Sequence, residues 1–68
     1  MGRGDAKRDA FDLKCYDVVQ RSAAPIAAKA VAEQVGHDWV EVRRVLDRLE
    51  RQKALSRKRV RGAWHYYV

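Results

Sequence analysis

Apolar residues recur at helical spacing along the first third of the chain. Phe11, Cys15 and Val19 fall on one stripe, and the charged residues Asp12, Lys14 and Asp17 lie off it. This pattern predicts a helix from about Asp9 to Arg21. Residues 1–8 carry no such stripe, so we expect a disordered tail over residues 1–8 and one folded domain over residues 9–68.

The next stretch contains a helix break and a second, shorter helix. Pro25 ends the first helix, because a proline ring removes a backbone donor and forces the preceding residue out of the helical region. We expect Ile26 to form an extended stub of one or two residues. Apolar positions then resume helical spacing from Ala27 to Val35, and Gly36 stands where a left-handed residue commonly ends a helix.

A third helix is predicted to begin almost immediately after the second one ends. Asp38 is a suitable N-cap, and Glu41 stands at the position that completes a capping box. The pattern continues to about Lys53, and the apolar stripe consists of Val42, Val45, Leu46 and Leu49. The short connection predicts a tight helix-turn-helix.

Beyond Ala54 the pattern is that of a β-hairpin. We expect strands over residues 55–60 and 63–68, joined by a turn at residues 61–62. Alternation places Trp64, Tyr66 and Val68 on a face that can cover the helices, with His65 and Tyr67 on the other face. The predicted fold class is therefore α+β, mainly α, with three helices and a C-terminal β-hairpin.

The positive charge is concentrated at the C-terminal end of the chain. The net charge is +6, yet residues 1–50 contain nine basic and nine acidic residues. The whole excess therefore comes from six basic residues after Glu50, namely Arg51, Lys53, Arg57, Lys58, Arg59 and Arg61. Such a localised positive field suits a polyanionic partner.

The order of these elements resembles the winged helix-turn-helix superfamily, over residues 25–68. Ala32, four residues before Gly36, stands where that motif takes a small residue, and its buried positions correspond to Val31, Val35, Val42 and Val45. The resemblance implies that the helix over residues 39–53 enters the DNA major groove. It also implies that a basic wing, residues 56–64, lies on the backbone or in the minor groove.

Two narrower resemblances concern the end of the chain. Residues 59–67 resemble the C-terminal segment of short stand-alone fimbrial-operon regulators, with a basic stretch, a glycine and an aromatic strand. Residues 41–46 with Trp64 are also similar to Z-form nucleic-acid-binding domains. However, the asparagine and tyrosine of those domains correspond here to Arg43 and Asp47, and their paired prolines are absent, so Z-form binding is the minor alternative.

The exposed face of the third helix carries the candidate base-reading residues, which are Trp39, Val40, Arg43, Arg44 and Asp47. Arg43 and Arg44 are the main candidates, since arginine donates two hydrogen bonds to guanine, while Val40 suits a thymine methyl group. Asp47 repels phosphate but can orient an arginine. The same face also fits a ladder of surface ion pairs from Arg43 to Asp47 to Arg51. Trp39 suits either stacking on the DNA backbone or packing over the second helix.

The candidate phosphate contacts are Lys29, at the start of the second helix, and four basic residues of the hairpin, Arg57, Lys58, Arg59 and Arg61. Alternation places the three arginines on one strand face. His37, in the turn, is either solvated or within reach of a phosphate.

Several function classes find no support in the sequence. No nucleophile stands beside a base, and there is neither a matched carboxylate pair nor a phosphate loop, so we expect no enzyme and no cofactor. The single Cys15 is expected to be a buried structural thiol, and no Cys/His cluster predicts a metal site. Without an apolar run of membrane-spanning length or a signal peptide, we expect an intracellular protein with no membrane partner.

Together these features predict sequence-specific binding of double-stranded DNA by a small transcriptional regulator. A winged-helix module that binds another protein is the main alternative, and Z-form or RNA binding is the minor one. A monomer, a homodimer through the first helix and a cooperative array on DNA are all compatible with the sequence.

Overall fold

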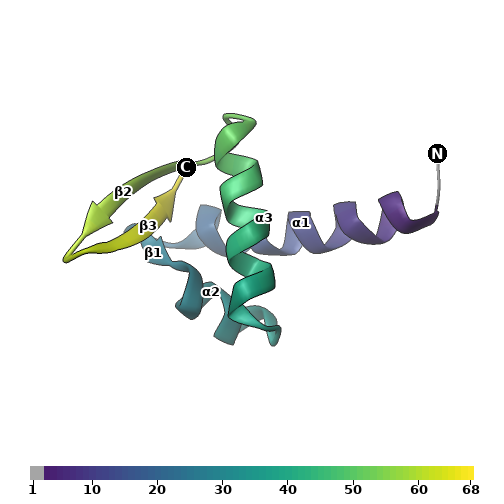
Figure 1. Ribbon diagram of the computed structural model, residues 1–68, viewed down its shortest axis with the longest axis horizontal. Coiled ribbons are helices and arrows are strands. Elements are labelled where there is room, and N and C mark those ends of the chain that lie inside the picture. Colours follow the sequence, from purple (N-terminus) through teal and green to yellow (C-terminus); the bar gives the residue numbers. More distant parts are fainter. Residues whose placement is uncertain (1–2) are drawn as a thin grey trace.

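Three helices are followed by a small antiparallel sheet in the computed structural model, which describes residues 3–68 and their side chains from residue 10 onward. The elements are α1 (Arg3–Arg21), β1 (Ile26–Ala27), α2 (Ala28–Val35), α3 (Trp39–Arg51), β2 (Ser56–Val60) and β3 (Ala63–Tyr67). In Figure 1, α3 crosses α1, and both α2 and the β2–β3 hairpin lie on the side away from the N-terminal end of α1. The α+β, mainly helical fold class with a winged-helix-like topology is confirmed.

The first helix is longer than its apolar stripe predicts. It begins at Arg3 rather than near Asp9, so residues 3–8 continue the helix where a disordered tail was expected. Ala6, Lys7 and Arg8 have high helix propensity and no proline interrupts the segment, which accounts for the extension. The first two residues of the expected tail lie outside the described residues.

The connection between α1 and α2 follows the prediction closely. The helix ends before Pro25, and Ile26 and Ala27 form β1 by pairing with Tyr66 and His65 of β3. Because Ala27 belongs to this strand, α2 starts one residue later than expected. Gly36 adopts the left-handed conformation with φ 69°, and its N–H donates to the carbonyl of Ala32 at 2.9 Å.

The capping box expected at the start of α3 does not form. Asp38 has the extended backbone of an N-cap, but its side chain makes no capping hydrogen bond. The Glu41 carboxylate lies 3.6 Å from Nε2 of His37 instead. The His37 ring in turn packs on Phe11 of α1, with 4.6 Å between ring centroids, so the turn is fixed by packing rather than by a cap.

The C-terminal end of α3 also comes earlier than expected. The helix ends at Arg51, because Lys53 adopts the left-handed conformation with φ 68°. The Ala54 N–H then donates to the carbonyl of Leu49 at 2.9 Å, which closes the last turn. The helix is therefore two residues shorter than the expected 39–53.

The sheet has the order β1-β3-β2, with both pairs antiparallel. Arg61 and Gly62, with φ values of 52° and 83°, form the two-residue turn between β2 and β3, and positive φ at both positions matches the twist of a tight hairpin. The expected aromatic row is only partly correct. Tyr66 is buried and Trp64 half-buried, but Val68 lies beyond the end of β3 and is 62% exposed.

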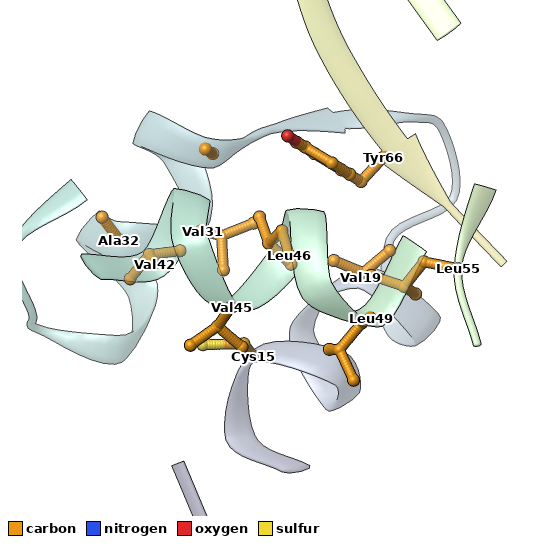
Figure 2. Packing of buried hydrophobic residues seen from close by; sticks show 11 residues of the cluster. Cys15, Val19, Val31, Ala32, Val42, Val45, Leu46, Leu49, Leu55 and Tyr66 are labelled. Carbon is orange, nitrogen blue, oxygen red and sulfur yellow. The ribbon is translucent and has the colours of Figure 1, made fainter. Parts of the chain in front are cut away.

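The core forms where α1, α2 and α3 meet the hairpin, as Figure 2 shows. Its buried members are Cys15, Val19, Ala28, Val31, Ala32, Val42, Val45, Leu46, Leu49, Leu55 and Tyr66. The predicted apolar stripe of α3 is thus confirmed. Of the buried positions that the resemblance implies, Val31, Val42 and Val45 are buried, whereas Val35 is only partly buried. Tyr66 is the largest fully buried side chain. No helix among residues 3–68 combines the length and apolarity needed to cross a membrane.

Cys15 lies inside this core as a free thiol. Burial, together with the nearby Asp12 carboxylate, raises the pKa of the thiol to about 11. The thiol therefore stays protonated near neutral pH, and it packs beside Val45 in Figure 2 as a small apolar group.

Candidate nucleic-acid interface

Helix α3 presents basic side chains on the face opposite its buried stripe. Val42, Val45 and Leu46 point into the core, which turns Arg43 and Arg44 outward. The Arg43 side chain is 52% exposed. Both candidate base-reading arginines are therefore accessible from solvent on the face that the helical period assigns them.

Trp39 and Val40 extend this exposed face to the first turn of α3. Trp39 is 45% exposed and is absent from the packed cluster of core residues, so it does not pack over α2 as a core residue. Val40 is 41% exposed. Each side chain offers an apolar surface next to the arginines.

Asp47 connects α3 to the β2–β3 hairpin, residues 56–67, which we call the wing from here on. Its Oδ1 accepts hydrogen bonds from the Tyr66 hydroxyl at 2.5 Å and from Arg57 Nη1 at 3.3 Å. Its Oδ2 lies 3.8 Å from Arg43 Nε. The first ion pair of the alternative ladder, from Arg43 to Asp47, is thus present. Its second pair, from Asp47 to Arg51, does not form, because the carboxylate turns toward the wing.

Arg57 is held against α3 rather than presented to solvent. Besides Asp47, its Nε lies 3.9 Å from the Glu50 carboxylate, and its guanidinium lies 4.3 Å from the centre of the Trp64 ring. Its side chain is only 33% exposed. Of the four predicted wing contacts, Arg57 is therefore the one whose charge is already matched within the fold.

The other three basic residues of the wing are exposed. The Arg59 guanidinium lies 4.9 Å from the centre of the Trp64 ring, on the sheet face that carries Trp64 and Tyr66. Lys58 is on the opposite face, where its register partner on β3 is His65. Arg61 lies in the turn rather than on the strand face where alternation placed it, because the hairpin reverses at that residue. Lys58, Arg59 and Arg61 thus surround the wing tip with positive charge.

A cleft of about 330 Å³ opens between the wing and the starts of α2 and α3. Residues of three segments line it: Ala27, Ala28 and Lys29; Trp39 and Arg43; and Gly62, Ala63, Trp64 and Tyr66. A second, more open hollow between α2 and the turn before α3 shares Lys29 and Trp39 with the first. The cleft therefore brings Lys29, predicted from its position alone, next to Trp39 and Arg43.

An ion pair between α1 and α3 was not anticipated from the sequence. Arg48 Nη2 donates to Asp12 Oδ1 at 2.6 Å, and the Asp12 side chain is 17% exposed. The two residues are 36 positions apart and each stands among other charged residues, so no local spacing indicates the pair. The contact fixes the crossing of α1 with the helix that carries Arg43 and Arg44.

The contact between Tyr66 and Asp47 makes folding sensitive to alkaline pH. Burial, the hydrogen bond to Asp47 and its negative charge raise the pKa of Tyr66 to about 12 from the ordinary 10. Between these values the unfolded chain loses a proton that the folded chain keeps, so stability present below pH 10 is lost as pH rises toward 12.

We therefore expect the free energy of unfolding to fall by roughly 1–3 kcal/mol more over this pH range in the wild type than in Tyr66→Phe. Urea titrations across the range measure this difference, since the lysines titrate alike in both proteins. Parallel pH curves for the two proteins would contradict the assignment.

Three comparisons with known proteins found no matching family model, curated relative or solved structure. Within the part of the chain described, no three His, Cys, Asp or Glu side chains gather as a metal site. The function must therefore be argued from the site itself.

Proposed function

We propose that this chain binds double-stranded DNA sequence-specifically, as a small transcriptional regulator. The observation that supports this most directly is the position of exposed Arg43 and Arg44 on α3, beside a wing whose tip carries three exposed basic residues. Side chains that can reach base edges thus lie on α3, and positive charge that can meet phosphates lies on the neighbouring wing. A protein that binds a specific DNA duplex needs both kinds of contact.

The dimensions of α3 suit the major groove. Its 13 residues span about 20 Å, and an α-helix of ordinary diameter fits that groove. Arg43 and Arg44 leave the helix near its middle, where they would reach base edges, with Val40 one turn earlier as a contact for a thymine methyl group. We assign the reading of sequence to this face.

The wing would supply phosphate contacts. Since Arg57 is engaged by Asp47 and Glu50, the contacts fall to Lys58, Arg59 and Arg61, with Lys29 on the neighbouring helix. The negative charge of Asp47 is opposed by Arg57 and Arg43, which reduces its repulsion of a phosphate backbone. The wing therefore contributes affinity for DNA of any sequence, and α3 contributes the preference for one sequence over another.

Fluorescence anisotropy with random and selected duplexes at several salt concentrations tests the proposal. With about four phosphate contacts, the logarithm of the binding constant should fall with the logarithm of salt at a slope near −3.6. The double variant Arg43→Ala, Arg44→Ala should bind the selected duplex about 10- to 100-fold more weakly and should lose its preference over random sequence.

The matched control is the double variant Lys14→Ala, Arg21→Ala, which removes two exposed positive charges from α1. We expect it to keep the sequence preference. Absence of binding to any duplex at about 50 mM salt would overturn the proposal.

The exposed apolar pair Trp39 and Val40 favours one second candidate, a module that binds an acidic protein partner. Aromatic residues are enriched at protein interfaces, and the wing would then meet acidic side chains instead of phosphates. The titrations separate the two functions, because a protein-binding module would not distinguish the selected duplex from the random one.

A further inference from the structure

The cleft between the wing, α2 and α3 has an unusual combination of walls. Trp39 and Trp64 supply two indole rings, and Lys29 and Arg43 supply two positive charges. Gly62, Ala63 and Trp64 of the hairpin line the same cleft, so the cleft lies against the wing. A ligand of this site would need both a flat apolar part and a negative charge.

The two indoles differ in how firmly they are held. Trp64 is half-buried and has the guanidinium groups of Arg57 and Arg59 within 4.3 and 4.9 Å of its ring centre, which fixes its position. Trp39 is 45% exposed. Among the described residues the aromatic ring pair is Phe11 with His37, so neither indole stacks on another ring. A cleft lined by one exposed indole and one fixed indole is suited to receive a flat ring.

The volume and charge of the cleft indicate a small ligand that has a flat ring and a negative charge. About 330 Å³ lies at the lower end of the range for small-molecule sites, roughly 300–1,000 Å³. A single nucleotide fits these features, because its base can stack on an indole while its phosphate lies beside lysine and arginine. A paired base inside a duplex cannot enter, since both of its faces are stacked.

We infer that this cleft holds one unstacked nucleotide of a bound DNA strand, with its base against Trp39 and its phosphate beside Lys29 and Arg43. The inference rests on the proposed function and deepens it, because Arg43 belongs both to the reading face and to the cleft. The protein then prefers a duplex that contains an unpaired base over the same duplex fully paired.

Three duplexes of one sequence test this inference with the full chain. One is fully paired, one has a single bulged 2-aminopurine, and one has an abasic residue at the bulge, which controls for the flexibility that a bulge adds. The 2-aminopurine bulge should bind about 5- to 150-fold more tightly than the abasic bulge, because a stacked base contributes about 1–3 kcal/mol. Its fluorescence should be quenched on binding.

Variants localise the effect to the cleft. Trp39→Ala should reduce the ratio of the two bulge affinities to about one, and Trp39→Phe, which keeps a flat ring, should restore part of it. The matched control is Tyr67→Ala, which removes an exposed aromatic ring from the other face of β3 and should keep the ratio. Far-UV circular dichroism checks that each variant is folded.

The outcomes for the inference and for the proposed function are distinct. Equal affinities for the three duplexes, or a ratio that survives in Trp39→Ala, would overturn the inference and leave duplex binding intact. If no duplex binds, the proposed function fails and the inference fails with it.

A titration with deoxyadenosine monophosphate identifies the source of the nucleotide. If the free nucleotide binds as tightly as the bulged duplex, the assignment to a DNA strand is overturned. Much weaker binding of the free nucleotide supports the assignment.

Discussion

Replacing Asp47 with alanine is expected to lower the free energy of unfolding by about 2–4 kcal/mol, although it removes an acidic residue from a basic protein. The buried Tyr66 hydroxyl would lose its acceptor, and an unsatisfied buried polar group costs about 1–3 kcal/mol. Arg57 would also lose its nearer carboxylate, at a smaller cost because it is one-third exposed and keeps Glu50.

Urea denaturation followed by far-UV circular dichroism measures the change. The control is Glu41→Ala, which removes an exposed carboxylate from the same helix and should change stability by less than about 0.5 kcal/mol. Asp47→Asn, which keeps an oxygen for Tyr66, should lie between the two. Equal stability of Asp47→Ala and Glu41→Ala would show that Asp47 does not hold the wing to α3.

Replacing Leu46 with alanine should leave the protein barely folded. Leu46 is fully buried in α3, and truncation of a buried leucine costs about 2–5 kcal/mol. A domain of 68 residues has only about 3–10 kcal/mol of stability in total. At the middle of both ranges the change removes about half of the free energy of unfolding, visible as a large drop in Tm.

The control for this variant is Leu13→Ala on α1. Leu13 is 66% exposed, so the same truncation removes little buried surface and should cost less than about 0.5 kcal/mol. A loss below about 1 kcal/mol in Leu46→Ala would mean that the core does not close around α3 as Figure 2 shows.

The sequence predicted those features of the fold that depend on neighbouring residues. Pro25 ends α1, Gly36 takes the left-handed conformation, and Gly62 supplies positive φ in the hairpin turn, each for a reason present in the residue itself. The boundary at Lys53 escaped prediction, because lysine adopts positive φ rarely and nothing in its type marks it.

Helical and strand periods predicted which side chains of the candidate site face outward, but they did not predict contacts between elements. Arg43 and Arg44 face outward as the period of α3 requires, whereas the partners of Arg57 depend on how the wing meets α3. Asp47 and Tyr66 are 19 positions apart, and their contact follows from the packing of two elements rather than from any spacing. Charge pairs between elements were therefore the part that the sequence left open.

The attachment of the wing to α3 through Arg57, Asp47 and Tyr66 has a consequence for association with any partner. A free hairpin would lose conformational entropy when it docks, and that loss weakens binding. Here much of the ordering is completed during folding, so the protein is preorganised and a larger share of each new contact appears as affinity. A partner must in return match a fixed angle between helix and hairpin, and a DNA duplex that does not match would have to bend.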